Sequence, residues 1–364
     1  MYLRLKPGVC ATPPSSTRNT EWEHPKLSRD LYDALVERNS ASYDWMHGGQ
    51  IGLIKFVDLH QFEFATTRAL KGSLVATIMV NLYLNGIEQL IVPGNGAACQ
   101  YSIGSQWNNR NRLTTLRGQA VVLQALAFGA RLSRRSTLRD LGIAIHRFVY
   151  SQATPLSSCR TASSDTRTHQ ARDSLRLRDN AWYALALRQF ADAYELRRLT
   201  RDADTIFETT VAIYEHRVPA HHCTVAAGST QSLDEIVAIA AALTHFGIVG
   251  SDRRLLCRAH TLIREAASHH AHADGGYCQS RVVIGDTDLL PDIDCTIELV
   301  RTSLALAREI PNHRLAPVTA HGERALFDPA IALARDPESG ILLVAETEAD
   351  HRPEAEAEMA LRNA

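Results

Sequence analysis

Apolar runs of about ten to fifteen residues, separated by charged turns, recur along most of this chain. Runs of this length are long for strands and suit helices that bury one face. They occupy residues 121–128, 141–149, 182–190, 206–214, 236–246, 255–263 and 297–307. Helices that recur in pairs with short turns predict helical hairpins, arranged as an open solenoid or a closed toroid.

Two glycine pairs favour the closed form. Gly48-Gly49 and Gly275-Gly276 each follow a predicted helix, and glycine at positive φ lets a loop fold back over the end of a barrel. Long loops within a helical frame often form a binding mouth, and we expect them at 151–175, 218–230 and 268–292. The sequence therefore predicts an all-α fold, an (α/α)6 toroid of helical hairpins with a short C-terminal strand.

Composition divides the chain into four parts. Residues 1–28 are polar and rich in Pro, Ser and Thr, which predicts a flexible arm. The barrel is expected over 29–312. An appendage over 313–348 contains the aliphatic run 341–345, which predicts one short strand, and an acidic tail follows over 349–364.

Charge and cysteine content exclude several classes of function. The 364 residues include 39 basic and 40 acidic side chains, which gives no support to a nucleic-acid or membrane partner. The seven cysteines are scattered without a C-x-x-C pair, so reduced thiols in a soluble cytoplasmic protein are expected. Gly94-Asn95-Gly96 lacks the Lys-Ser/Thr of a phosphate loop and is interpreted as a turn. We expect no cofactor.

An ordered series of short matches resembles a known family. The matching residues are Asp44-x-x-His47-Gly48-Gly49, Lys55-Phe56, Gly86-Ile87, Tyr101-Ser102, Trp107, Leu116, Ala120, Asn180-Ala181, Leu233-Asp234-Glu235 and Asp274-Gly275-Gly276-Tyr277. They are similar to the barrel part of the thioredoxin-domain-containing, spermatogenesis-associated protein family. That resemblance implies an (α/α)6 toroid like those of glycoside hydrolases and sugar 2-epimerases. The thioredoxin domain has no counterpart here, so no thiol-disulfide exchange is expected.

The departures from the family motif concern its charged residues. Asn111, Leu113, Thr114 and Gly118 stand where the family has His, Glu, Lys and Asp, although the apolar frame is retained. Our first hypothesis is therefore a catalytically degenerate barrel that acts as a binding or interaction module for a saccharide or a protein partner.

The alternative hypothesis is a carbohydrate-active enzyme, an isomerase, epimerase or glycosidase. Glu235 and Asp294 would then serve as acid and base, with Asp179 orienting them. The candidate substrate-binding residues are Trp107, Tyr101, Asn180, Tyr277 and Arg110. Carboxylates at helix starts also stabilise the helix as caps, and Ser232 with Glu235 has capping-box spacing, so both interpretations stay open.

Histidines and cysteines offer further chemistry. His221-His222 and His269-His270-x-His272 lie in polar loops without the H-x3-H spacing that holds a metal on one helix face. Solvated histidines are favoured, and no metal site is predicted. Cys99 is the best placed nucleophile, although a small buried hydrophobic residue is the favoured interpretation.

Overall fold

The computed structural model describes residues 29–152, 177–217, 232–272, 275–278, 292–310, 315 and 317–322. Most of these residues are helical. The helices are α1 (Arg29–Ala41), α2 (Leu59–Leu70), α3 (Leu74–Leu90), α4 (Leu116–Ala130), α5 (Ser136–Ser151), α6 (Leu177–Ala193), α7 (Arg197–Arg217), α8 (Leu233–Val249), α9 (Arg253–His270) and α10 (Ile293–Glu309). The expected arm, the strand at 341–345 and the acidic tail lie outside the described residues.

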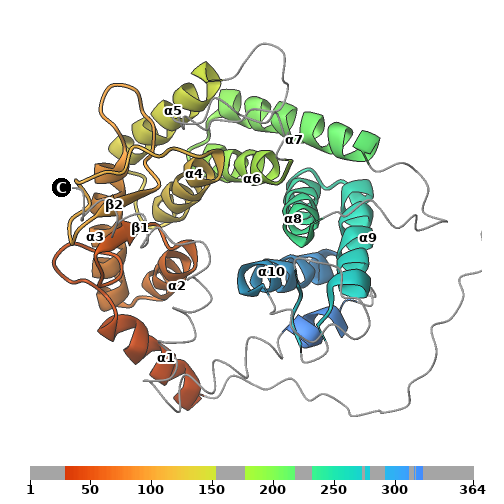
Figure 1. Cartoon of the computed structure of the whole chain (residues 1–364), viewed down its shortest axis with the longest axis horizontal. Coiled ribbons are helices and arrows are strands. Elements are labelled where there is room, and N and C mark those ends of the chain that lie inside the picture. Colours follow the sequence, from red (N-terminus) through yellow and green to blue (C-terminus); the bar gives the residue numbers. More distant parts are fainter. Residues whose placement is uncertain are drawn as a thin grey trace, which may run out of the picture.

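The helices form a ring of two layers (Figure 1). Helices α2, α4, α6, α8 and α10 face the centre, and α3, α5, α7 and α9 lie outside them. The inner helices α2, α4, α6 and α8 each pack against the outer helix that follows, and successive inner helices from α2 to α10 pack against one another. The prediction of an α/α toroid of helical hairpins is confirmed.

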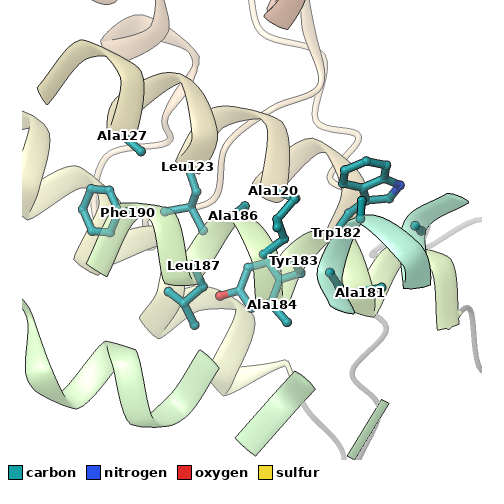
Figure 2. Close-up of a cluster of buried hydrophobic side chains, with 14 of the residues drawn as sticks. Ala120, Leu123, Ala127, Ala181, Trp182, Tyr183, Ala184, Ala186, Leu187 and Phe190 are labelled. Carbon is teal, nitrogen blue, oxygen red and sulfur yellow. The ribbon is translucent and has the colours of Figure 1, made fainter. Parts of the chain in front are cut away.

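Small side chains bring α4, α6 and α8 close together. Helix α6 is buried on nearly all sides, and its buried alanines include Ala181, Ala184 and Ala186. Figure 2 shows Ala120 and Leu123 of α4 directed at this surface. Because alanine adds almost no bulk to the helix, neighbouring helices approach closely and fill the space with few voids.

Side-chain caps mark where several helices begin. Asp58, Ser73, Thr115, Asp252 and Asp292 each accept a hydrogen bond from a backbone N–H of the first turn, at the starts of α2, α3, α4, α9 and α10. These bonds satisfy donors that have no partner within the helix. Local sequence therefore fixes the starts of helices on both layers of the ring.

A two-stranded sheet joins two segments far apart in the sequence. Strand β1 (Ile54–Phe56) pairs antiparallel with β2 (Tyr101–Ile103), with Lys55 opposite Ser102. The Lys55 ammonium is buried and lies 2.7 Å from an Asp44 carboxylate oxygen. Burial alone would raise the pKa of Asp44, but Lys55 and the N–H groups of His47 and Met46 lower it to about 2. This sheet was not predicted.

The residues that carry the family resemblance form a packing unit beside this sheet. Trp107 is 1% exposed, and its indole N–H donates to the His47 carbonyl at 2.9 Å. A Cβ at Gly86 would lie 2.5 Å from the Trp107 ring, and one at Gly49 would lie 2.7 Å from it. Gly48 has a φ of 81° and Gly49 of 74°, as expected for a loop that folds back. These residues hold the outer wall together.

Candidate functional site

Charged side chains from the first three turns of the inner helices form a cluster at one end of the ring. We call it the mouth cluster. It consists of His60 and Glu63 on α2, Arg117 on α4, Arg178 and Asp179 on α6, Asp234 on α8, and Asp294, Glu298 and Arg301 on α10. Helix N-termini carry a partial positive charge, which stabilises the carboxylates placed there.

Arg178 ties two inner helices together. Its Nε lies 2.8 Å from a carboxylate oxygen of Asp179, and its Nη1 donates to Asp234 on α8. Burial disfavours the charged guanidinium, but the two carboxylates raise the pKa of Arg178 above its ordinary value. Asp179 is itself only 6% exposed. The two carboxylates are thus fixed in place and paired with one cation.

Arg117 offers a donor that no described residue uses. Its guanidinium lies over the Trp182 indole, 4.3 Å from the ring centroid. Burial lowers the pKa of Arg117, while the charges of Glu298, Asp179 and Asp294 oppose this effect. The Arg117 Nη1 atom is buried and has no hydrogen-bond partner among the described residues. Buried donors are nearly always satisfied, so a ligand or water oxygen fits this position.

Arg301 joins the last inner helix to the first. Its guanidinium pairs with Glu63 on α2 and lies 3.4 Å from Glu298 one turn earlier on α10. The His60 ring nitrogen lies 3.3 Å from the same guanidinium. Charged side chains therefore complete the ring between α10 and α2.

The predicted acids occupy the starts of three inner helices. Asp179 and Asp294 both lie within electrostatic range of Arg117, on α6 and α10. Asp294 is exposed and Glu235 is half-buried in the first turn of α8. Ser232 is the N-cap of α8, but its side chain makes no cap hydrogen bond, so the Ser232 half of the expected capping box is missing. The catalytic roles stay predictions.

Three predicted ligand-binding aromatics are core residues instead. Trp107 is 1% exposed, Tyr101 is 4% exposed and Tyr277 is 0% exposed. The Tyr277 hydroxyl donates to the Val318 carbonyl at 2.9 Å, which holds the short helix 317–322 against the barrel. Glycine pairs and β2 draw these rings into the wall, and their role in ligand binding stays a prediction.

The two remaining predicted binding residues lie in different places. Asn180 is fully buried beside Asp179 in the first turn of α6. Arg110 donates to the Gln89 carbonyl and lines a cavity on the outer wall, away from the mouth cluster. Sequence reasoning missed Arg178, Glu298 and Arg301. The signal that identifies them is their position within the first three turns of an inner helix.

The other sequence candidates give no reactive centre among the described residues. No group of three His, Cys, Asp or Glu side chains is placed there to hold a metal ion. The buried His270 makes a 2.9 Å hydrogen bond to the Cys278 carbonyl, whereas His221-His222 lies outside the described residues. Cys99 is buried, and burial raises the pKa of its thiol, which opposes thiolate formation. No described helix is long and apolar enough to span a membrane.

Comparison with known proteins identifies the architecture. No protein-family profile and no curated protein sequence matches this chain. A sugar epimerase from a ruminal bacterium superposes with a TM-score of 0.65 at 11% identity, covering 82% of this chain and 84% of that one. The chain has an α/α toroid fold. Cellobiose 2-epimerase from Spirochaeta thermophila (TM-score 0.64, 13% identity, 82% and 83% covered) and a D-mannose isomerase (0.61, 13%, 82% and 86%) share it.

A structural similarity at such low identity establishes the α/α toroid fold and nothing finer. The link to the thioredoxin-domain-containing family therefore stays a prediction from the sequence. The geometry adds a set of chemical groups at the mouth. They are ion-paired carboxylates, an exposed carboxylate at Asp294, an Arg117 donor that no described residue satisfies, and the indole beneath that guanidinium.

Proposed function

We propose that this chain is a carbohydrate-active enzyme of the sugar isomerase or epimerase class and that the mouth cluster is its active site. One observation carries the proposal: all five described inner helices contribute charged side chains from their first three turns to one cluster. Partly buried charges cost solvation free energy, and such groupings concentrate at functional sites. The epimerases and isomerase that share the fold support the choice of class.

The proposed chemistry is proton transfer next to a sugar carbonyl. A carboxylate removes the proton from the carbon beside the carbonyl, and the proton returns either to the neighbouring carbon or to the other face of the same carbon. Asp294 and Glu298 lie one turn apart on α10 and face Arg117, so we assign them the proton transfers. The Arg117 Nη1 donor would stabilise the negative charge that develops on the carbonyl oxygen. Arg178 holds Asp179 as a positioning group.

The test is deuterium exchange. Reducing mono- and disaccharides are incubated with the protein in heavy water, and deuterium at the carbon beside the carbonyl is followed by NMR. The wild type should incorporate deuterium, and Asp294→Asn or Glu298→Gln should slow the exchange by about 10²- to 10⁴-fold without lowering the melting temperature. Glu309→Gln, at the exposed far end of the same helix, is the matched control and should exchange like the wild type.

A second candidate function is a saccharide-binding module without catalysis. It is favoured by Arg178, which already occupies two carboxylates that a catalyst would otherwise use. A sugar that raises the melting temperature without exchanging deuterium would support this module over the enzyme. At 100 times its dissociation constant such a ligand stabilises the fold by about 2.7 kcal/mol. If no saccharide exchanged deuterium and none raised the melting temperature, both functions would be excluded.

A further inference from the structure

A second cavity lies on the outer wall of the ring, between α5 and α7 and away from the mouth cluster. Its volume is about 630 Å³, within the usual range for small-molecule sites. Figure 1 shows the end of α5 beside the start of α7. The lining residues are Ile143, His146, Arg147, Tyr150, Ser151, Glu195, Leu196, Arg197, Arg198, Leu199 and Asp202. We call this cavity the outer pocket.

Positive charge is in excess around the outer pocket. Arg147, Arg197 and Arg198 are exposed, and none of them makes an ion pair with a described residue. The two acids of the lining are already engaged. Glu195 pairs with Arg134 at 2.7 Å, and Asp202 lies 3.1 Å from the His146 ring. Three arginines without an acidic partner favour an anion, and their planar donor forks match phosphate and carboxylate oxygens.

Apolar side chains also line the outer pocket. Ile143 and Leu196 are half-buried, and Leu199 is buried. Tyr150 contributes a ring that is 58% exposed. An apolar floor beside charged groups suits a ligand that carries its charge at one end of a ring or aliphatic body.

A buried series of hydrogen bonds fixes the wall of the outer pocket. His146 is 6% exposed; one of its ring nitrogens lies 3.0 Å from the Tyr183 hydroxyl, and the other lies 3.1 Å from Asp202. Tyr183 belongs to the inner helix α6, so these hydrogen bonds connect the outer pocket to the core of the ring. Hydrogen bonds at both ring nitrogens hold the imidazole in one orientation. The pocket is therefore preorganised on rigid helices.

We propose that the outer pocket binds a small organic phosphate, a phosphomonoester on a ring-containing body. A single carboxylate is satisfied by one arginine fork, whereas the three outer oxygens of a phosphate accept from several donors at once. Three lining arginines without an ion-pair partner among the described residues thus match phosphate better than carboxylate. The proposal is independent of the function assigned to the mouth cluster.

Calorimetric titration of the full chain with phenyl phosphate, inorganic phosphate and benzoate tests this proposal. Phenyl phosphate should bind at least about tenfold more tightly than either other probe, because each of them lacks one half of the expected ligand. Arg197→Gln or Arg198→Gln should weaken phenyl phosphate by about tenfold. Arg201→Gln is the matched control, since Arg201 is exposed on the same helix and does not line the pocket.

Four results would overturn the proposal. They are no binding of phenyl phosphate, equal weakening by Arg201→Gln, benzoate binding as tightly as phenyl phosphate, and inorganic phosphate binding as tightly as phenyl phosphate. Circular dichroism of each variant confirms that the fold is retained, so a loss of affinity reports on the pocket.

Discussion

Two regions of the ring are built by opposite means. In the packed arc, which consists of α4, α6 and α8, the helices meet through alanines and other buried side chains. At the seam, where α10 meets α2, Arg301 reaches across to Glu63 and His60. The packed arc is held by burial of apolar surface, and the seam by charged side chains that are partly exposed.

This difference suggests that one region stabilises the ring and the other allows a ligand to enter it. Burial of apolar groups is worth roughly 25 cal/mol per Å² of surface, whereas an exposed ion pair is worth about 0 to 1 kcal/mol. The packed arc is therefore the stable frame, and the seam should open at a lower free energy than this arc. Because the seam residues belong to the mouth cluster, local opening there would admit a ligand without disturbing the frame.

The largest expected effect comes from a cavity where α6 of the packed arc meets α5. Phe190 on α6 is fully buried and fills the space left by Gly142, where a Cβ would lie 2.1 Å from its ring. Phe190→Ala should destabilise the protein by about 3–5 kcal/mol in urea unfolding. Phe64 on α2 is only half-buried, so Phe64→Ala is the matched seam variant and should cost less than about 2 kcal/mol. Equal costs would contradict the distinction between the two regions.

The second largest expected effect is a loss of stability at acid pH, which arises from a histidine in the packed arc. Burial lowers the pKa of His245 on α8 from 6.5 to about 4; Asp192 opposes this shift and Arg188 adds to it. The unfolded chain therefore binds a proton in a window where the folded chain does not. Stability is full above pH 6.5 and falls as the pH drops towards 4, by about 2–3 kcal/mol.

Urea unfolding at a series of pH values measures the His245 contribution. His245→Gln removes the titrating group and should flatten the curve between pH 4 and 6.5. An unchanged slope in this variant would show that the acid sensitivity arises elsewhere.

The smallest effect is expected at the seam. Arg301→Gln removes the ion pairs with Glu63 and Glu298 and should cost at most about 1 kcal/mol, less still at high salt. Amide hydrogens of α2 and α10 should exchange faster than those of α6 and α8, and the variant should increase this difference in exchange rate. A cost above about 3 kcal/mol would mean that the pair is buried and that the seam belongs to the stable frame.

Several features of the fold could be predicted because they depend on neighbours in the sequence. The apolar run 182–190 lies within α6, and the run 236–246 lies within α8. Gly275 and Gly276 adopt the positive φ expected of a folded-back loop, with values of 117° and 76°. The strands β1 and β2 escaped prediction because three residues are too few to show a two-residue alternation.

The candidate site was harder to predict because its residues carry ambiguous signals. An acid at a helix start has the same sequence signature whether it caps the helix or faces a ligand, as Asp179 and Asp294 illustrate. An aromatic residue beside a glycine has the same signature in a core as in a binding site. Trp107 lies in the wall, whereas Trp182, inside an apolar helix, lies beneath Arg117.

The sequence alone determined the helices, their pairing into hairpins and the class of fold, because helical periodicity and glycine conformation act over a few residues. Only the tertiary structure decided which charges meet. Arg301 and Glu63 are 238 positions apart in the chain and become partners when the ring closes. Arg117 and Asp179 likewise approach because α4 and α6 pack through alanines. Such long-range contacts depend on the closure of the whole ring, which no local pattern encodes.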